Sequence, residues 1–442
     1  MVHMYLLYNL ALCLYFVACI PLVGYRAWRR GKPLGRLGDR FGRPPATLNP
    51  HGRPSIWIHA VSVGEALAAK TLVAPLKATY PAHRLLVSTT TASGQHVARQ
   101  LEPPVDATFY APLDFPPCVA GTLDCVAPDL LVLVDTEVWP NLLRACRRRG
   151  VRTIIVNGRV SDRSYRGYRL VRRFLRRALD GVDRVCAQNE LWGRRFLALG
   201  LSPARLTVTG SLKFDAAGDA AAAGDADAVL RPFHFAAGRP VFIAASTLRG
   251  EEEQVLRAFS CARQSVADTL LIIAPRHPER FAEAEAVAAG QGFAVARRTD
   301  LDADAAPAAD VIVLDTIGEL ARLFQLATVV FVGGSLVPAG GHNILEPAVF
   351  GKPVLFGPHM ENFAGVADLF VERDAAWQVH SEGELGEAVA ALLADAARRE
   401  ALGAAARELV EGNRGARQRT LAAIRALLPP AARGTESWTA AC

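Results

Sequence analysis

The sequence predicts two α/β domains, each built on a parallel sheet that is covered by helices. Three observations lead to this fold class. The chain has 442 residues, more than one hydrophobic core usually serves. Short apolar runs alternate with longer helical patterns over most of its length, which is typical of parallel sheets with crossover helices. A low-complexity stretch, DAAGDAAAAGDAD at residues 215–227, separates two such series and is typical of a linker.

The apolar runs predict strands in two series. The first comprises residues 55–59, 84–88, 130–134, 153–156, 184–187 and 206–208. The second comprises residues 241–245, 270–274, 311–314, 329–332 and 353–356, and alanine-rich helices follow. Open parallel sheets bind ligands outside the carboxyl ends of their strands, so we expect functional residues in the loops that follow these runs.

Residues 4–23, MYLLYNLALCLYFVACIPLV, carry no charge and are about as long as a bilayer-spanning helix. The basic residues that follow are Arg26, Arg29, Arg30, Lys32, Arg36, Arg40 and Arg43. By the positive-inside rule this order predicts a single uncleaved N-terminal anchor with the rest of the chain in the cytoplasm. Asn9 and Pro21 weaken the span and leave open a helix that lies on the membrane or is buried in the fold.

Composition excludes several classes of partner. The net charge of +7 comes without a basic recognition motif, so we expect no nucleic acid, and an anionic membrane or substrate suits the excess better. The eight cysteines form no CxxC and the ten histidines form no HExxH. We therefore expect no protein-bound metal, and reduced thiols in a cytosolic compartment.

One loop carries the strongest functional signal. It lies in FVGGSLVPAGGHNILEPAVFGKPVLFGP, residues 331–358, where two glycine pairs follow an apolar strand. A short helix is expected to begin near Ile344 with Glu346 in its first turn. Glycines allow sharp turns and free N–H groups at a helix start favour an anion, so the pattern predicts a phosphorylated nucleotide with Glu346 at the ribose hydroxyls. A capping box, with Asn343 as N-cap and Glu346 bonding back to it, fits equally well.

Three loops of the first domain carry chemically capable residues. In HAVSVGEALAAK, Glu65 opens a helix, where it could take a proton from a hydroxyl or only complement the helix dipole. In VDTEVWPN, Asp135 and Glu137 follow a strand, as functional carboxylates or as a helix cap. In TGSLKFD, Lys213 could neutralise an anionic ligand or be a solvated linker charge.

Two loops of the second domain add to the nucleotide signal. In APRHPERF, Pro275 and Arg276 follow a strand, and Arg276 could contact a phosphate or a base, although basic surface loops are common. In DTIGEL, backbone groups of Ile317, Gly318 and Glu319 could read a nucleobase at a turn into a helix. Together with residues 331–358, three loops of one sheet converge on a nucleotide.

Ten motifs in order carry a family resemblance. They are HAVSVGE, TTTASG, DTEVWPN, AQNE, TGSLKFD, PRHPERF, DTIGEL, FVGGSLV, GGHNILEP and GPHMENF. The set, which with the anchor extends to about Val379, closely resembles the family of 3-deoxy-D-manno-oct-2-ulosonic acid (Kdo) transferases of lipopolysaccharide synthesis. The resemblance implies an inverting glycosyltransferase of the GT-B fold, with two Rossmann-like domains facing a cleft. It also implies transfer from CMP-Kdo to a tetraacylated lipid A precursor without a cofactor.

The resemblance assigns roles to individual residues. Glu65 falls on the general base, and Asp135 and Lys213 fall on the stabilisers of the transition state. The residues that match the CMP-binding segments are Pro275, Arg276, Ile317, Gly318, Glu319, Asn343, Ile344, Leu345 and Glu346. Three positions depart from the family: Asp135 stands where a glutamate is expected, and Leu248 and Ala339 stand where basic or polar residues are common.

The expected organisation follows from these assignments. It comprises an anchor at 1–30, an acceptor-binding domain at 31–214, a linker at 215–230, a CMP-Kdo-binding domain at 231–430 and a tail at 431–442. The expected location is the bacterial inner membrane, with both domains on the cytoplasmic face. The helical pattern at 163–181 places arginines on one face, either against an anionic lipid or simply in solvent. The number of Kdo residues transferred is left open.

Three other functions remain as alternatives. A GT-B transferase that uses a UDP-sugar would share the architecture, and competition by CMP against UDP would separate the two. A membrane-anchored dinucleotide oxidoreductase should show GxGxxG just after a first strand, and residues 55–75 have no such pattern. A catalytically inactive nucleotide-binding scaffold is disfavoured because Glu65 and Lys213 are both present.

Overall fold

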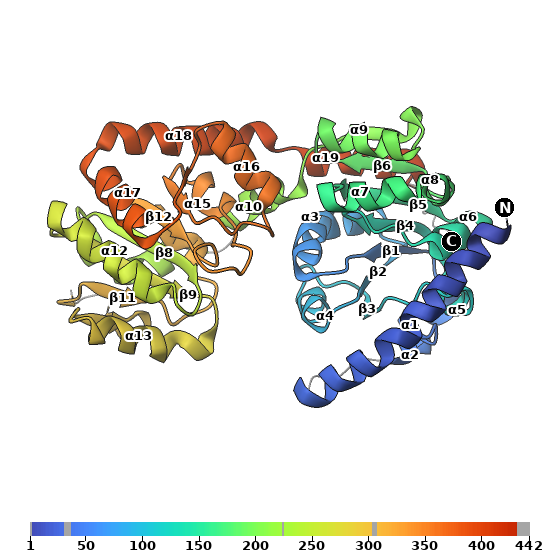
Figure 1. Cartoon of the computed structure of the whole chain (residues 1–442), viewed down its shortest axis with the longest axis horizontal. Coiled ribbons are helices and arrows are strands. Elements are labelled where there is room, and N and C mark those ends of the chain that lie inside the picture. The colour runs from blue at the N-terminus through green and yellow to red at the C-terminus, as the bar shows by residue number, and fades with distance from the viewer. Residues whose placement is uncertain (1, 31–36, 223–224, 303–306, 431–442) are drawn as a thin grey trace, which may run out of the picture. The chain divides into compact units, whose positions relative to one another are not determined.

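The computed structural model describes residues 2–30, 37–222, 225–302 and 307–430, which belong to two compact units (Figure 1). Unit 1 runs from Met1 to Ala216 and continues from Arg414 to Cys442, and unit 2 runs from Ala217 to Asn413. The chain therefore passes from one unit to the other twice. The expected tail at 431–442 and two of the basic residues that follow the expected anchor, Lys32 and Arg36, lie outside the described residues.

Unit 1 is built on a parallel sheet of seven strands in the order β3-β2-β1-β4-β5-β6-β7. The strands are β1 (Ser55–His59), β2 (Arg84–Thr89), β3 (Ala107–Tyr110), β4 (Pro128–Val134), β5 (Arg152–Gly158), β6 (Arg184–Ala187) and β7 (Leu206–Val208). The order reverses between β1 and β4, which pair directly. In open α/β sheets the carboxyl ends of two such strands form the ligand-binding switch point.

Helices cover both faces of this sheet (Figure 1). They are α1 (Val2–Arg30), α2 (Leu37–Arg40), α3 (Val63–Thr79), α4 (Ala92–Arg99), α5 (Pro116–Val126), α6 (Pro140–Arg148), α7 (Asp162–Leu170), α8 (Arg172–Leu179), α9 (Glu190–Leu199), α10 (Leu212–Ala222) and α19 (Ala416–Leu427). Alternate residues of β1 point to opposite faces, as pleating requires. Ile56 and Ile58 enter the core under α3, α4 and α19, while Trp57 enters the core under α5, α6, α8 and α9.

The last helix returns to unit 1, although its residues were expected in the second domain. Ala416 and Ile424 of α19 are buried in the core that α3 also covers. Asp215 fixes the start of α19, because its carboxylate accepts from the N–H groups of Gly415 at 3.0 Å and Arg417 at 2.8 Å. The expected linker is also largely helical, in α10 and in α11 (Ala226–Leu230).

Helix α1 lies against unit 1 along one side. The rings of Tyr5 and Tyr8 contact Phe174 of α8, with ring centroids 5.4 and 5.2 Å apart. The Tyr8 hydroxyl donates to the buried carboxylate of Asp114 at 2.8 Å. The opposite side is apolar and exposed, and its large residues are Leu6, Leu7, Leu10, Leu14, Tyr15 and Val17.

The predicted membrane-spanning anchor is not supported. Among the described residues, no helix combines the length and the apolar character that crossing a bilayer requires. The structure agrees better with the alternative left open by Asn9, whose amide oxygen accepts from Asn141 of α6 at 2.7 Å. The ring of Phe16 also lies 5.8 Å from that of Phe115, so this part of the helix is held against the unit.

Unit 2 contains a second parallel sheet of seven strands, in the order β10-β11-β9-β8-β12-β13-β14. The strands are β8 (Val241–Thr247), β9 (Leu270–Pro275), β10 (Val295–Arg297), β11 (Val311–Val313), β12 (Val329–Val332), β13 (Val354–Phe356) and β14 (Trp377–Gln378). The remaining helices are α12 (Glu252–Ser265), α13 (Phe281–Gly290), α14 (Leu320–Leu323), α15 (Leu345–Val349), α16 (Ala364–Glu372), α17 (Glu382–Ala394) and α18 (Ala396–Asn413). The order reverses between β8 and β12, which pair directly, so the second switch point lies at their carboxyl ends.

Candidate active site

Glu65 lies at the switch point of unit 1, in the first turn of α3 directly after β1. Its carboxylate accepts from the N–H of Val61 at 2.6 Å and from the hydroxyl of Ser62 at 2.9 Å. Burial raises the pKa of Glu65 to about 7, and the carboxylates of Asp135 and Glu137 add to the rise while the two hydrogen bonds oppose it. Glu65 therefore accepts hydrogen bonds at the start of α3, and its pKa also suits proton exchange near neutral pH.

Asp135 follows β4 and adopts a left-handed backbone with φ of 62°. Its carboxylate accepts from the amide nitrogen of Asn157 at 2.6 Å and lies 3.4 Å from Nε of Arg159. Burial raises the pKa of Asp135, while Arg159, Asn157 and Lys213 lower it. The side chain is 17% exposed, so its charge is stabilised mainly by protein groups.

Lys213 lies in the first turn of α10, after Gly210 turns the chain with φ of 88°. Burial lowers the pKa of Lys213, and the carboxylates of Asp135 and Glu65 raise it. The structure thus brings Glu65, Asp135 and Lys213, which come from three separate loops, into one electrostatic group. Together they offer a base and a cation that the protein keeps partly dehydrated.

Glu137, which the sequence left open as a functional carboxylate or part of a helix cap, is a fourth member of this group. Its carboxylate accepts from the indole N–H of Trp139 at 2.9 Å, and the Trp139 ring lies edge-on to His59. Burial raises the pKa of Glu137 to about 7, and Asp135 adds to the rise. The sequence TEVW could have indicated this hydrogen bond, because it places the indole donor of Trp139 two residues after the Glu137 carboxylate.

The glycine-rich loop of unit 2 is organised by Glu251, which precedes α12. Its fully buried carboxylate accepts from the backbone N–H groups of Gly334 at 2.6 Å, Ser335 at 3.0 Å and Leu336 at 2.9 Å. It also accepts from Leu248 at 2.9 Å, so one side chain joins the loops after β8 and β12. Gly333 is required here, because a Cβ would lie 2.9 Å from the Glu251 carboxylate.

The second part of the loop brings a cation and a carboxylate together. Arg276 is exposed at the end of β9, and its charge lowers the pKa of Glu346, which burial raises. Glu346 also accepts from the amide of Asn343 at 3.0 Å, and Asn343 accepts from the N–H of Leu345 at 3.2 Å. The predicted capping box is wrong, because Ile344 and not Asn343 is the N-cap of α15 and Glu346 bonds the side chain of Asn343. The contact still holds the Glu346 carboxylate close enough for the charge of Arg276 to act on it.

His342, which the sequence did not single out, lies near Arg276 in the same loop region. Burial lowers the pKa of His342 to about 4, and the positive charges of Arg276 and His277 lower it further. The Nε2 atom of His342 is buried and has no hydrogen-bond partner within the protein. The GGHN motif contained this signal, since a histidine followed the second glycine pair.

The other predicted nucleotide residues divide into two kinds. Ile317 is 73% exposed and Gly318 has φ of 92°, so this turn presents its backbone to solvent after β11, the neighbour of β9. The Glu319 carboxylate instead accepts from Arg298 at 2.9 and 3.1 Å. Two further predicted residues, Ile344 and Leu345, are buried in the core, so only their backbone could face a ligand.

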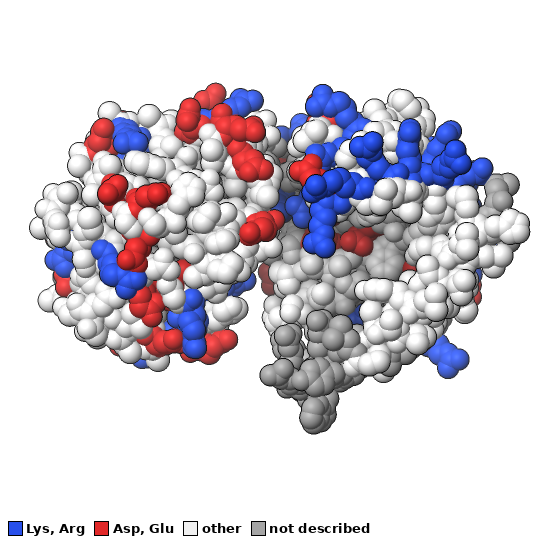
Figure 2. Space-filling view, viewed as in Figure 1, with Lys and Arg blue, Asp and Glu red and all other residues white. Residues whose placement is uncertain are grey.

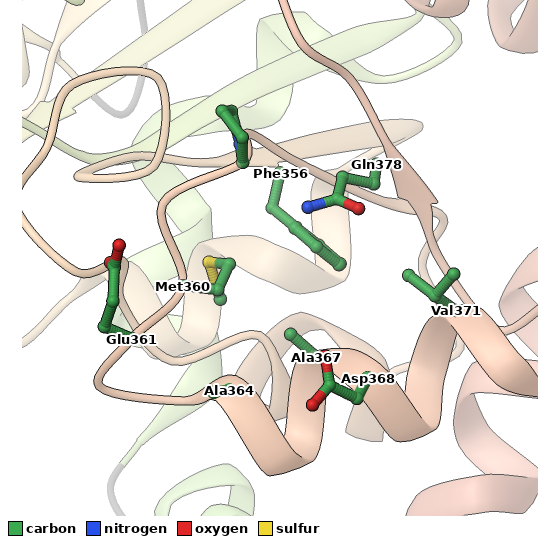
Figure 3. A pocket seen from close by; sticks show the side chains of 9 residues that line it. Phe356, Met360, Glu361, Ala364, Ala367, Asp368, Val371 and Gln378 are labelled. Atoms are coloured by element: carbon green, nitrogen blue, oxygen red, sulfur yellow. The ribbon is translucent and has the colours of Figure 1, made fainter. Parts of the chain in front are cut away.

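A small pocket adjoins this region at the carboxyl end of β13 (Figure 3). Its volume is about 160 Å³, and its lining includes Met360, Ala367, Asp368 and Gln378. It is smaller than sites that hold drug-sized ligands, and it includes none of the predicted CMP residues. Within the described part of the chain, no cluster of His, Cys, Asp and Glu side chains could hold a metal ion.

The fold is shared with several solved structures. UDP-GlcNAc 2-epimerase from Neisseria meningitidis matches with a TM-score of 0.59 at 12% identity, over 84% of this chain and 99% of that one. A glycosyltransferase from Rickettsia africae matches with a TM-score of 0.55 at 11% identity, over 85% and 99%. These likenesses confirm the predicted pair of parallel-sheet domains with a GT-B-like arrangement of strands.

Sequence relatives identify the family. Residues 35–216 match the family model described as "3-Deoxy-D-manno-octulosonic-acid transferase (kdotransferase)". A 3-deoxy-D-manno-octulosonic acid transferase from Bordetella pertussis is 37% identical over 91% of this chain and 96% of its own length. The enzyme of the same name from Haemophilus influenzae is 33% identical over 91% and 95%. The chain belongs to the Kdo transferase family and is a glycosyltransferase, which confirms the resemblance read from its motifs.

Replacing Glu251 tests the organisation of the glycine-rich loop. Glu251→Ala leaves four backbone N–H groups without their acceptor, and each unsatisfied group costs about 1–3 kcal/mol when it is buried. We expect calorimetry to show a lower unfolding temperature and titration to show weaker CMP binding. Glu387→Ala, at an exposed position of α17, is the matched control. Equal unfolding temperatures for the two variants would contradict the role of Glu251.

Replacing Glu137 tests the electrostatics around Glu65. Because burial holds the pKa of Glu65 at about 7, activity should rise with pH through that range as the base loses its proton. Glu137→Gln removes a like charge, so the rising limb of kcat should move to lower pH by less than about one unit. Glu190→Gln, at an exposed position of α9, should leave it in place. A limb that stays fixed, or moves to higher pH, would refute the coupling.

Proposed function

We propose that the protein transfers Kdo from CMP-Kdo to a hydroxyl group of a tetraacylated lipid A precursor, with inversion and release of CMP. One observation carries the proposal beyond family membership. The Glu65 carboxyl group, with its pKa raised to about 7, interacts with Asp135 and Lys213 at the switch point of unit 1. A base with that pKa is close to the optimum for taking a proton from an attacking hydroxyl near neutral pH.

The reaction follows from this group. The acceptor oxygen forms a bond to the anomeric carbon of Kdo while the bond from that carbon to the phosphate oxygen breaks. The bonding electrons leave with CMP, and the acceptor proton moves to Glu65. Lys213 offsets the negative charge of the departing phosphate or of the Kdo carboxylate, and Asp135 keeps Lys213 charged by raising its pKa against burial.

Unit 2 is the proposed holder of CMP. Arg276 and His342 offer donors to the single phosphate, and the exposed turn at Ile317 and Gly318 offers its backbone to the base. Glu346, fixed by Asn343, is placed to accept from the ribose hydroxyls. Pro275 ends β9 and directs the chain into Arg276. No metal or cofactor is part of this proposal.

Attachment to the inner membrane, on its cytoplasmic face, is the remaining part of the proposal. Helix α1 packs on α8 through Tyr5, Tyr8 and Phe174, so the exposed apolar residues of α1 and the arginines of α8 belong to neighbouring helices. Basic side chains gather over α7, α8 and α9 (Figure 2). Those of α7 and α8 are exposed, and they are Arg163, Arg166, Arg169, Arg172, Arg173, Arg176 and Arg177. An apolar face beside a basic one suits an anionic lipid surface and a phosphorylated lipid acceptor.

Removing the proposed base tests the chemistry. Glu65→Ala should abolish transfer, because no other group in the proposed mechanism accepts the acceptor proton. CMP affinity should remain nearly unchanged, because the proposed CMP contacts belong to unit 2. Release of CMP and its binding would be measured separately, by enzymatic assay and by calorimetric titration. Turnover of Glu65→Ala near the wild-type rate would contradict the assignment of Glu65 as the base.

Polar substitution on the exposed side of α1 tests the membrane contact. The double variant Leu10→Asp, Leu14→Asp should co-sediment with anionic phospholipid vesicles at least about tenfold more weakly, since each buried leucine contributes about 1.5–3 kcal/mol. Val371→Asp changes a comparably apolar exposed position in unit 2 and should bind as the wild type does. If the double variant still binds vesicles normally, α1 is not the membrane contact.

A further inference from the structure

Asn157 lies near the end of β5, and no motif in the sequence assigns it a role. It is fully buried, and it adopts a left-handed backbone with φ of 55°, which asparagine tolerates better than most residues. The side-chain amide of Gln188 donates to the Asn157 carbonyl oxygen at 2.7 Å. This hydrogen bond holds the backbone of Asn157 independently of the contacts of its side chain.

The side chain of Asn157 is both a hydrogen-bond donor and a hydrogen-bond acceptor. Its amide nitrogen donates to Oδ1 of Asp135 at 2.6 Å. Its amide oxygen accepts from the N–H of Leu212 at 3.0 Å and from the hydroxyl of Ser211 at 3.3 Å. One side chain thus joins the Asp135 carboxylate to the backbone that directly precedes Lys213.

Only an amide satisfies both requirements in that space. An ionised carboxylate could accept from Leu212 but could not donate to Asp135, and an aliphatic side chain could do neither. The strand end of β4 is tied to the same place by a second contact, because the N–H of Asp135 donates to the carbonyl of Val156 at 2.9 Å. Asn157 therefore links the Asp135 carboxylate directly to the backbone beside Lys213.

We propose that Asn157 is a positioning residue for glycosyl transfer, which holds the Asp135 carboxylate and the Lys213 backbone in register. The inference rests on the proposed transfer from CMP-Kdo. Arg159 is the competing partner of Asp135, with Nε 3.4 Å from the carboxylate. Without Asn157, Asp135 can turn toward Arg159, and the negative charge that raises the pKa of Lys213 moves away from it.

The charged groups around Asp135 set the expected effect. They are Arg159, Lys213, Glu65 and Glu137. All four belong to unit 1, whereas the proposed CMP contacts belong to unit 2. A displaced Asp135 should therefore lower kcat and leave the KM for CMP-Kdo nearly unchanged.

Two substitutions separate positioning from folding. Asn157→Ala removes both contacts and should lower kcat about 10- to 100-fold, the loss expected for a misplaced group, with KM for CMP-Kdo within about threefold. Asn157→Asp keeps the acceptor for Leu212 and so retains the contact that supports the fold. Its new carboxyl group can donate to Asp135 only when protonated. The ratio of its kcat to the wild-type kcat should therefore rise as the pH falls from about 8 to about 6.

Asn49→Ala is the matched control in the same unit. Asn49 is also buried, and its amide donates to the carbonyls of Arg53 at 2.8 Å and Val126 at 2.9 Å, away from the switch point. It should lose thermal stability as Asn157→Ala does while keeping the wild-type kcat and pH profile per folded molecule.

The outcomes distinguish the inference from the proposed function. Wild-type kcat in Asn157→Ala, or a constant activity ratio with pH in Asn157→Asp, would overturn the positioning role alone. Wild-type protein that releases no CMP from CMP-Kdo in the presence of the lipid acceptor would overturn the proposed function, and the inference with it. A lower kcat at unchanged KM together with the pH-dependent ratio would establish the role of Asn157.

Discussion

Ionisable groups are buried together at the switch point of unit 1, and the chemistry of the protein depends on how their charges are stabilised. Withdrawal from water disfavours the charged form of each group, so it raises the pKa of Glu65 and lowers that of Lys213. The opposite charges offset this cost for Asp135 and Lys213, whereas Glu65 lies beside two like charges. Burial therefore acts against the charged forms of Asp135 and Lys213 while their mutual attraction acts for them, and it raises the pKa of Glu65 to about 7. In the proposed mechanism Glu65 is the base and the other two are the electrostatic stabilisers.

Unit 2 stabilises its switch point in a related way. A buried carboxylate, that of Glu251, accepts from four backbone N–H groups and so fixes the loop that follows β12. Those backbone N–H groups are already hydrogen-bonded within the protein. In the proposed function the nucleotide phosphate is therefore bound by Arg276, His342 and the remaining backbone rather than by the first glycine pair. His342 belongs to the loop that Glu251 fixes, whereas Arg276 follows β9.

Much of this architecture could be predicted from sequence because buried parallel strands are continuous apolar runs. The strands that escaped prediction are β3, β10 and β14, which are short and lie at or near sheet edges, where partial exposure removes the apolar signal. Glu65, Asp135 and Lys213 could be placed because each follows a strand. Asn157 and Glu251 could not be assigned, because all but one of their side-chain partners lie 22 to 85 residues away along the chain. The membrane-spanning prediction for α1 failed for a similar reason: the uncharged residues 4–23 do not reveal the contacts of Tyr8 and Asn9 with the unit.

The central claim is that this chain moves Kdo from CMP-Kdo to a lipid A precursor. The most direct measurement incubates the full-length protein with CMP-Kdo and a tetraacylated precursor in detergent, then determines the mass of the lipid product and the amount of CMP released. The account predicts a mass increase of one or more Kdo residues, with one CMP released for each, and inhibition by CMP but not by UDP. An unmodified precursor, or transfer from a UDP-sugar instead, would contradict it.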